Sequence, residues 1–482
     1  MGNDLDIVQQ LWSLCNVLRD DGITYHQYVN ELTYLLFLKM AEETGAEIDL
    51  PQGYRWRDLT KLSGEDQFDF YRNQLAILGT RGSPRVRAIF ANPTSLLRHP
   101  HNLNTLVRRI DELDWYQARE EGLGDVYEGL LQKNANEKKS GAGQYFTARP
   151  LIDSMVSVMK PTVDDTIQDP AAGTGGFLVA ADRYIRQHSD SAAWSGKQRR
   201  KYGSGTFVGM EHVQDTYRLA LMNLMLHGIE SESPTGGVHF GDTLGPQGQA
   251  LPKVTLMLTN PPFGNKSGGG LPSRTDLPFP TSNKQLSFLQ HIYLKLVPGG
   301  RAAVVLPDNV LFEGTIGRQV REDLMEKCNL HTILRLPSGI FYAHGVKTNV
   351  LFFTRGEQDR ANTREVWIYD LRTNMPQFGR RTPLDRQHFT EFESAFGADP
   401  CGGCASLAAR VGVEENVRFR RFSRDWIANH GNNLDITWLH QRHDSPEAVL
   451  DPAVLAQEAA DELDGALEEL RSIIFDLGED CE

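Results

Sequence analysis

Long apolar runs, an excess of basic residues and a dense set of cysteines are all missing from this sequence. The longest apolar stretch, Leu32 to Met40, is too short to cross a bilayer and is interrupted by Thr33 and Lys39. With 50 Lys and Arg against 63 Asp and Glu, the formal net charge is −13. This balance argues against tight nucleic-acid binding by the chain without a partner, although local basic patches can still contact phosphates.

Cysteine usage fits a reducing cytoplasm better than a disulfide framework. The five cysteines are Cys15, Cys328, Cys401, Cys404 and Cys481. Two of them, in Cys401-Gly-Gly-Cys404, have the spacing of a zinc knuckle, but no second cysteine pair or nearby histidine pair completes four ligands. A reduced loop is favoured there and no metal is expected. No secretory signal is evident, so the sequence predicts a cytoplasmic location.

The periodicity of apolar residues changes along the chain and predicts its domains. From Asp4 to about Leu131 they recur at three- and four-residue steps, which predicts an N-terminal helical domain. Lys133 to Gly143 is polar, small and charged, as in a flexible linker. A leucine and alanine stripe after Asp451 predicts a final helix, which packs on this chain or, as we favour, on a partner. The predicted domains are residues 1–140, 141–400 and 401–482.

Helices and short apolar runs alternate over roughly residues 150 to 355. This pattern predicts an α/β fold with a parallel sheet covered on both faces and antiparallel pairing at its end. Arg186 to Lys201 is expected to form an exposed loop, with DNA contact as the less favoured alternative, and Pro298 to Gly300 to form a turn. Gly264 to Pro280 is expected to be irregular, and the basic and aromatic stretch 418–424 suits either nucleic acid or an edge strand.

A glycine-rich turn follows the apolar strand that ends at Asp169. The three glycines Gly173, Gly175 and Gly176 let the backbone approach a ligand closely and present N–H groups at the start of a helix. The spacing is neither that of a dinucleotide site nor that of a phosphate loop, so the turn alone is as consistent with packing as with binding.

Carboxylates at the ends of the next two strands favour the binding interpretation. Glu211 and Asp242 stand where parallel α/β sheets hold acceptors for ribose hydroxyls and for an adenine amino group. Either residue alone is as consistent with a helix cap as with a ligand contact. Together with the glycine turn and Asp169, they predict a nucleoside site.

The tetrapeptide Asn260-Pro261-Pro262-Phe263 directly follows the apolar run 254–258. Proline neither donates to a sheet nor lets its predecessor become helical, so the run is expected to be a buried strand ending at the ligand-binding edge. Asn260 Oδ1 and the Pro261 carbonyl can accept both protons of a planar exocyclic amine while Phe263 stacks on the ring. Acceptors outside the ring plane favour a pyramidal nitrogen, whose lone pair is then free to attack a cofactor's electrophile.

In residues and order, the chain resembles the amino-group DNA methyltransferases that use S-adenosylmethionine, and more closely the modification subunit of type I restriction-modification enzymes. Seven stretches carry the resemblance: Ala142-Gly-Gln-Tyr-Phe-Thr147, Asp169-Pro-Ala-Ala-Gly-Thr-Gly-Gly-Phe177, Asn260-Pro-Pro-Phe-Gly264, Thr281-Ser-Asn-Lys-Gln285, Pro298-Gly-Gly-Arg-Ala-Ala-Val-Val305, Pro307-Asp-Asn-Val-Leu-Phe312 and Lys347-Thr-Asn-Val-Leu-Phe-Phe353. The helical N-terminal region and helical tail fit the same family, so the resemblance covers nearly the whole chain.

The resemblance implies a Rossmann-like S-adenosylmethionine-dependent methyltransferase domain between an N-terminal helical domain and a helical C-terminal tail. The implied activity is methyl transfer from S-adenosylmethionine to the N6 amino group of adenine in a specific DNA sequence. The residues implied for the cofactor are Gln144, Tyr145, Phe146, Thr147, Ala148, Arg149, Asp169, Gly173, Thr174, Gly175, Gly176, Glu211 and Asp242. The residues implied for the flipped adenine are Asn260, Pro261, Pro262 and Phe263.

The resemblance also implies partners. These are DNA, a specificity subunit that reads the bases, commonly with two modification subunits to one specificity subunit, and a restriction subunit in the full assembly. We therefore expect the isolated chain to bind cofactor but to methylate DNA poorly. The Cys401 to Cys404 segment has no counterpart to which a role can be assigned.

Three other functions share part of the pattern. Methyltransferases of protein glutamine also use Asn-Pro-Pro-aromatic, but they lack the Gln-Tyr-Phe-Thr segment and the long helical domains. Cytosine N4 methylation needs the same geometry, although Asn rather than Ser at position 260 favours adenine. A non-catalytic clamp that retains the fold is disfavoured by the intact Asn260 and Glu211.

Overall fold

The computed structural model describes most of the chain as two compact units. The described residues are 4–14, 17–18, 25–115, 124, 126–131, 147–229, 237–264, 271–341, 346–376, 378, 382–403, 410 and 418–439. Within them, the first unit comprises residues 1–138, 160–259 and 273–276, and the second comprises residues 139–159, 260–272 and 277–482. The linker and final helix expected from the sequence lie outside the described residues, and the division into three domains remains a prediction.

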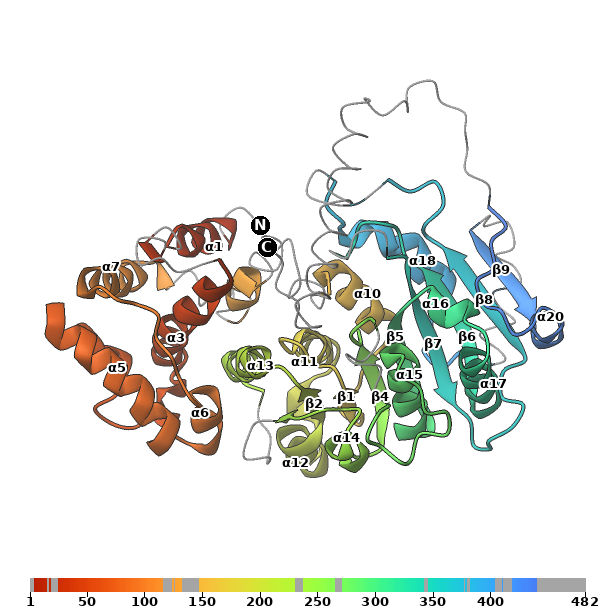
Figure 1. Ribbon diagram of the computed structural model, residues 1–482, viewed down its shortest axis with the longest axis horizontal. Coiled ribbons are helices and arrows are strands. Elements are labelled where there is room, and N and C mark those ends of the chain that lie inside the picture. Colours follow the sequence, from red (N-terminus) through yellow and green to blue (C-terminus); the bar gives the residue numbers. More distant parts are fainter. Residues whose placement is uncertain are drawn as a thin grey trace, which may run out of the picture. The chain divides into compact units, whose positions relative to one another are not determined.

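The amino-terminal part of the first unit contains only helices among its described residues (Figure 1, red to orange). They are α1 (Asp4–Ser13), α3 (Tyr25–Thr44), η1 (Ala46–Asp49), α4 (Trp56–Thr60), α5 (Gly64–Arg81), α6 (Pro84–Ile89) and α7 (Pro100–Asp111). The middle of α3 is buried on every side, including the consecutive residues Leu35, Leu36, Phe37 and Leu38. A helix enclosed in this way needs no polar stripe, which explains its continuous apolar sequence. The predicted helical N-terminal region is confirmed.

A buried arginine connects this helical part to the rest of the first unit. Arg218, on α13 (Gln214–Leu226), donates from a guanidinium nitrogen to the Tyr34 hydroxyl of α3 at 2.7 Å. The same guanidinium lies 4.7 Å from the centre of the Tyr34 ring. Helix α13 is therefore fixed on one side by the helical part and follows β2 directly in the chain.

Four parallel strands in the order β3-β2-β1-β4 form the sheet of the first unit. They are β1 (Ile167–Asp169), β2 (Phe207–Glu211), β3 (Val238–Phe240) and β4 (Val254–Thr259). Asp169 pairs with Gly209, and Glu211 pairs with Phe240, so the carboxyl ends of β1, β2 and β3 meet at one edge. Strand β4 is buried except at Thr255 and leads directly into Asn260, as predicted.

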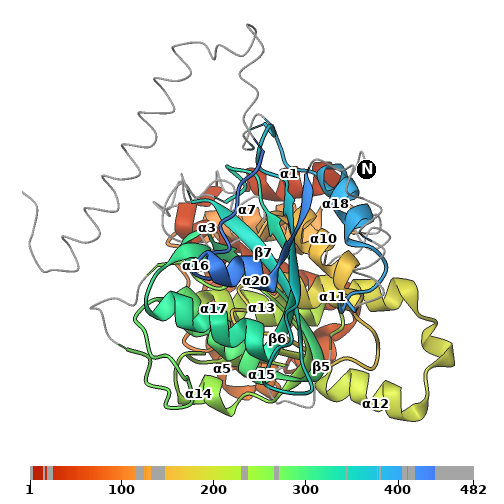
Figure 2. The same ribbon diagram turned by 90° about the vertical axis from the view of Figure 1, so that its right-hand side faces the viewer.

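The remaining helices of the first unit correct one expectation. They are α11 (Gly176–His188), η3 (Ser191–Ala193), α12 (Gly196–Gly205), α13 and α14 (Pro246–Ala250). The loop predicted for residues 186–201 is wrong, because α11 continues to His188 and α12 begins at Gly196 (Figure 2, yellow). Ser195 Oγ accepts the Gln198 N–H at 3.2 Å, while the Gln198 side chain accepts the Ser195 N–H at 2.9 Å. This capping box starts a helix that has almost no apolar face, so periodicity did not reveal it.

The sheet of the second unit has the strand order β5-β7-β6-β8-β9. Its members are β5 (Leu296–Pro307), β6 (Cys328–Arg335), β7 (Thr348–Arg355), β8 (Glu365–Asp370) and β9 (Phe419–Ser423). Strands β6 and β8 are parallel and the other described pairs are antiparallel, which confirms an α/β fold with antiparallel pairing at its end. The turn predicted at Pro298 to Gly300 lies inside β5, although Gly299 keeps a φ of 74° that favours glycine. The basic and aromatic stretch 418–424 contains the edge strand β9, one of its two predicted alternatives.

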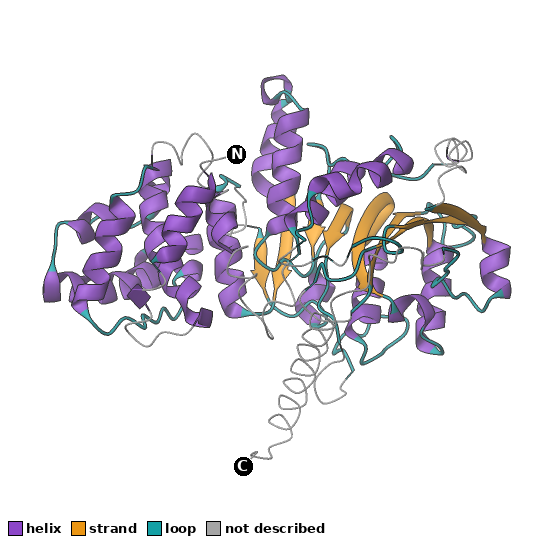
Figure 3. Ribbon diagram, turned by 90° about the horizontal axis from the view of Figure 1, so that it is seen from above, coloured by secondary structure: helices purple, strands orange, loops and turns teal. Residues whose placement is uncertain are grey.

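Helices cover the strands of the second unit as well. They are α10 (Arg149–Met159), α15 (Lys284–Lys295), α16 (Asn309–Phe312), α17 (Ile316–Lys327), η5 (Arg386–Phe389), α18 (Thr390–Phe396) and α20 (Arg424–Asn429). Helices α15 and α17 pack on β5 and β6 (Figure 2), while α10 contacts α18, where Ser154 Oγ donates to Glu393 Oε1 at 2.6 Å. Figure 3 shows helices on both sides of the strands. In the described part of the chain, no helix is both long and apolar enough to span a membrane.

Candidate active site

The glycine-rich turn begins where β1 ends and leads into α11. Gly173 has a φ of 54° and Gly175, the N-cap of α11, has a φ of 85°. The backbone conformation at Gly175 favours glycine, and a Cβ there would lie 2.5 Å from Leu224 Cδ1, so the Leu224 side chain would have to shift. The turn therefore keeps its backbone bare beside the carboxyl ends of the strands, as a site for a closely approaching ligand needs.

Glu211 lies against this turn. Its Oε2 accepts the Gly173 N–H at 2.9 Å, and its Oε1 accepts the N–H groups of His212 and Val213 at 2.9 and 2.8 Å. Burial raises the pKa of Glu211, while these backbone hydrogen bonds oppose the shift. The structure thus brings together two elements, the glycine turn and the acid of β2, that the sequence predicted for one site.

Asp169 is fully enclosed at the end of β1. Its Oδ1 accepts the Ala171 N–H at 3.1 Å. Burial, with a smaller contribution from the Glu211 charge, raises the pKa of Asp169 to about 7, against the opposing effect of the Ala171 hydrogen bond. Asp169 is 1% exposed, so it shapes the turn from beneath.

Asp242 and its neighbours form the third part of this edge. Asp242 Oδ1 accepts the Leu244 N–H at 2.8 Å, and the Thr243 hydroxyl donates to the Pro170 carbonyl. The Arg274 guanidinium donates to the Thr243 carbonyl at 3.1 Å and forms two hydrogen bonds with Asp276 at 2.8 and 2.6 Å. The Arg274 side chain is completely buried. Arg274 was not predicted from the sequence, because a single arginine in a glycine- and proline-rich stretch carries no periodic or motif signal.

Two apolar side chains are exposed at the same edge of the first unit. Val213 and Phe240 are 51% exposed, and the Phe240 ring lies 5.6 Å from that of Tyr217. Large apolar side chains left half exposed beside polar acceptors are typical of a surface that a ligand covers. Neither residue was predicted from the sequence, although each lies two positions from a predicted acid.

The tetrapeptide belongs to the second unit, and its asparagine is buried there. Asn260 is 8% exposed, and its Nδ2 donates to the Thr147 hydroxyl at 2.9 Å. The other amide atom, Oδ1, is buried and has no hydrogen-bond partner among the described residues. Since an amide has one acceptor end and one donor end, the contact with Thr147 leaves the acceptor end available. A buried, unpartnered acceptor is costly and calls for an explanation.

An aromatic pair adjoins this acceptor in sequence. Phe263 is half-buried, and its ring meets that of Phe341 edge to face, with centroids 6.0 Å apart and an interplanar angle of 76°. Phe341 is 6% exposed, and its steep angle to Phe263 shows that the two rings are not stacked face to face. Phe341 was not predicted; the only signal was its place ahead of the Lys347 to Phe353 stretch.

The segment ahead of the glycine turn is only partly described. Gln144, Tyr145 and Phe146 lie outside the described residues. Helix α10 begins at Arg149, and the carbonyl of the preceding Ala148 accepts the first helical N–H groups. Arg149 Nε lies 3.8 Å from Asp153 Oδ2. Thr147 is the member of this segment whose described contact reaches another predicted site residue.

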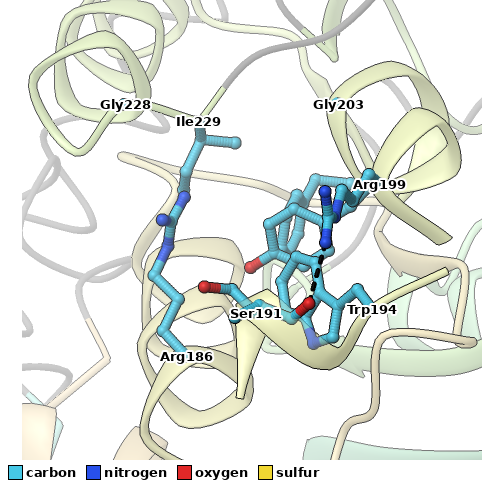
Figure 4. Close-up of a pocket in the computed structure, with 10 residues that line it drawn as sticks. Arg186, Ser191, Trp194, Arg199, Gly203, Gly228 and Ile229 are labelled. Carbon is cyan, nitrogen blue, oxygen red and sulfur yellow. Dashed lines mark hydrogen bonds between the residues drawn. The ribbon is translucent and has the colours of Figure 1, made fainter. Parts of the chain in front are cut away.

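A separate cavity of about 590 Å³ lies in the first unit, away from the predicted residues. It is lined by Arg186, Ser191, Ala192, Trp194, Arg199, Tyr202, Gly203, Phe207, Gly228 and Ile229. Phe207 is the first residue of β2, so the cavity opens at the amino edge of the strands, opposite the edge at which Glu211 lies. Figure 4 shows Ser191 between Arg186 and Arg199. The Arg199 guanidinium donates to the Ala192 carbonyl at 2.8 Å.

Metal ligation finds no support in the described part of the chain. No group of three or more His, Cys, Asp or Glu side chains there could hold a metal ion. The Cys401 carbonyl accepts the Thr354 hydroxyl at 2.8 Å, and its N–H donates to Asp399 Oδ1 at 2.9 Å, so this loop packs on the sheet. Cys404 lies outside the described residues.

Comparison with known proteins gives concordant results. Residues 118–443 match the N-6 DNA Methylase family, and residues 7–110 match the HsdM N-terminal domain. The chain is 50% identical to the type I restriction enzyme StySJI methylase subunit of Salmonella typhimurium over 99% of this chain and 96% of that protein. The crystal structure of the EcoKI M protein is similar at 45% identity and a TM-score of 0.57, covering 98% of this chain and 97% of that one. A structure from a study of complex assembly in the type I system has 26% identity and a TM-score of 0.71, covering 99% and 98%.

Proposed function

Since this chain belongs to the methylase subunits of type I restriction-modification enzymes and is a site-specific adenine-N6 DNA methyltransferase, we propose which of its residues perform the reaction. Asn260 Oδ1 and the Pro261 carbonyl accept the two protons of the adenine amino group, and Pro262 holds the chain extended between them and Phe263. Phe263 stacks on the flipped base, and its ring also contacts that of Phe341. The observation that carries this proposal is the buried Asn260 Oδ1, which has no partner among the described residues.

The chemistry follows from the direction of these acceptors. The adenine amino nitrogen is a poor nucleophile while its lone pair is delocalised into the ring. Acceptors that bind best when the nitrogen is pyramidal stabilise the transition state more than the ground state, and so raise the rate of methyl transfer. Burial of Asn260 strengthens this effect, because water does not compete for the acceptor. Thr147 keeps the amide turned so that Oδ1, rather than Nδ2, faces the base.

We further propose that the first unit binds S-adenosylmethionine at its carboxyl edge. Glu211 is placed to accept from the ribose hydroxyls beside the bare backbone of Gly173 to Gly176, and Asp242 lies where an adenine amino group can donate. Val213 and Phe240 supply apolar sides for the adenine ring. These donors, acceptors and apolar surfaces suit a nucleoside-containing methyl donor, and when bound S-adenosylmethionine supplies an electrophilic methyl group.

The partners of the methylase are also part of the proposal. The net charge of −13 supports the dependence on another subunit for DNA binding. We propose a specificity subunit, with two methylase subunits for each, and a restriction subunit in the complete assembly. The isolated chain then binds S-adenosylmethionine but methylates DNA poorly.

The test is transfer of a tritiated methyl group to duplex DNA, followed by nucleoside analysis, with and without the co-encoded specificity subunit. Asn260→Ala is expected to lower the rate by about 10²- to 10³-fold, the usual effect of removing one such stabilising group. Asn329→Ala is the matched control, because Asn329, on β6 of the second unit, also has an amide side chain and donates to the Gly402 carbonyl. The proposal is refuted if the Asn260 variant binds cofactor and assembles normally but still forms N6-methyladenine at the wild-type rate.

A further inference from the structure

The residue that follows the tetrapeptide has an unusual backbone and an anchored peptide group. Gly264 is exposed and has a φ of 100°, a conformation that favours glycine. A Cβ added at Gly264 would meet nothing within 4 Å, so glycine is required here by the backbone angle and not by crowding. A freely moving glycine at this point would let the chain leaving Phe263 take many directions.

Gln285, at the start of α15, prevents this motion. With its amide assigned so that the nitrogen faces the carbonyl and the oxygen faces the N–H, Gln285 Nε2 lies 3.1 Å from the Gly264 carbonyl oxygen and Oε1 accepts the Gly264 N–H. This is the amide orientation in which each atom of the side chain faces a group of the opposite kind. The Lys284 N–H also donates to the Gly264 carbonyl, at 3.3 Å. Both polar groups of Gly264 are therefore held by the first turn of α15.

The clamp is itself rigid, because its neighbours are buried and bonded. Gln285 is 3% exposed and Asn283 is 7% exposed. Asn283 Oδ1 accepts the Leu286 N–H at 3.1 Å, which caps α15, and lies 2.5 Å from the Gln285 Nε2. Asn283 Nδ2 donates to Glu313 Oε2 at 2.8 Å. The stretch Thr281 to Gln285, to which sequence analysis assigned no role, is thus connected to the end of the tetrapeptide.

We propose that Gln285 is a positioning residue for base binding: by fixing both polar groups of Gly264, it sets the place of Phe263 and the Pro261 carbonyl against the flipped adenine. This inference rests on the proposed role of Asn260 to Phe263. Displacement of a catalytic group by about 1 Å can lower a rate by about 10²-fold. Loss of the clamp should therefore reduce base capture and methyl transfer, while cofactor binding in the first unit remains.

The chain offers a matched control on the same helix. Gln290 is fully buried and clamps Phe279 with the same chemistry. Its Oε1 accepts the Phe279 N–H at 2.8 Å, and its Nε2 donates to the Phe279 carbonyl at 2.9 Å. Substitution of Gln290 or of Gln285 therefore removes comparable hydrogen bonds. Of the two glutamines, Gln285 is the one that binds the residue next to Phe263.

The experiment compares Gln285→Met, Gln285→Glu, Gln290→Met and Gln290→Glu in the methylase assembled with its co-encoded specificity subunit. Methionine keeps the volume and removes the hydrogen bonds, while glutamate keeps an acceptor for the N–H and removes the donor. The target sequence is first identified from the positions of N6-methyladenine in the DNA of cells that express the complex. The DNA probe is a duplex with this sequence in which 2-aminopurine replaces the target adenine. The fluorescence of 2-aminopurine rises when the base leaves the stack, so it reports base capture directly.

Gln285→Met is expected to lower kcat/KM for DNA by roughly 10- to 100-fold, to reduce the 2-aminopurine signal, and to leave the Kd for S-adenosylmethionine within about twofold. Gln285→Met and Gln290→Met should lower the melting temperature by similar amounts. Gln290→Met, however, should keep the 2-aminopurine signal of the wild type. The inference is overturned if the Gln285 variants capture the base like the wild type, or if both glutamines give equal losses. A failure of the proposed function looks different, because the wild type and Asn260→Ala would then methylate alike.

Discussion

Thr147 provides the sharpest test of how the active site is organised, because sequence and structure suggest different roles for it. The resemblance places Thr147 among the cofactor-binding residues, whereas its hydroxyl accepts a hydrogen bond from Asn260 Nδ2 at 2.9 Å. Thr147→Val keeps the shape of the side chain and removes only the hydroxyl. Thr147→Ser is the complementary variant, because it keeps the hydroxyl and removes a methyl group.

The size of the effect follows from burial. Asn260 and Thr147 are 8% and 7% exposed, so water cannot readily replace the lost acceptor. An unsatisfied buried donor costs about 1–3 kcal/mol, which corresponds to a roughly 5- to 150-fold lower kcat if the amide turns away to satisfy its Nδ2. The Kd for S-adenosylmethionine should change by less than about twofold, and Thr147→Ser should stay within about threefold of the wild-type kcat.

The assay is single-turnover methyl transfer at saturating S-adenosylmethionine, with the cofactor Kd measured separately by calorimetry. If Thr147→Val raises the cofactor Kd and leaves kcat unchanged, the hydroxyl serves the cofactor and the reasoning from its contact with Asn260 is wrong. If both quantities stay at their wild-type values, the hydrogen bond has no role in catalysis.

Three further predictions concern the first unit. The pKa of Asp169 is raised to about 7 on folding, so the folded state binds the extra proton and the free energy of unfolding falls as pH rises from about 4 to 7. In urea unfolding, the free energy of Asp169→Asn should depend on pH less steeply than that of the wild type, by up to about 1.4 kcal/mol per pH unit. An unchanged pH slope would contradict this. Gly175→Ala should lose about 1–3 kcal/mol of stability and bind S-adenosylmethionine more weakly. Its control, Gly203→Ala, lies in open space on α12 and should be tolerated. Equal melting temperatures of the two variants would count against this prediction. Arg274→Met should destabilise the first unit by about 1–3 kcal/mol and weaken cofactor binding through the Thr243 turn, and calorimetry showing a wild-type Kd would remove Arg274 from the site.

The elements that could be predicted from the sequence are those whose signals are local. Strand β4 was found because an apolar run ends at two prolines, and the glycine turn because its composition departs from any ordinary helix or strand. The places of Glu211 and Asp242 followed from the rule that parallel strands present their carboxyl ends at one edge, and the register of β1, β2 and β3 confirms that edge. The helical character of the N-terminal region followed in the same way from its periodicity.

The contacts that organise the site are not local, which is why the sequence did not reveal them. Asn260 and Thr147 are 113 residues apart, and Arg274 reaches Thr243 across 31 residues. No pattern within a window of the sequence contains such a pair. Helix α12 was missed for another reason: it begins with a capping box at Ser195 but has almost no apolar stripe, so its polar composition was mistaken for that of a loop.

The two prolines of the tetrapeptide also explain why Asn260 keeps a free acceptor. Asp169 and Asp242, at the ends of their own strands, each accept the N–H of the residue two positions later, at 3.1 and 2.8 Å. Asparagine commonly satisfies its side-chain oxygen in the same way. After Asn260, however, the next two residues are Pro261 and Pro262, which have no N–H to donate. The same sequence that ends β4 therefore prevents Asn260 Oδ1 from being satisfied by the backbone two residues later, and leaves the acceptor available for the base-binding role that we propose.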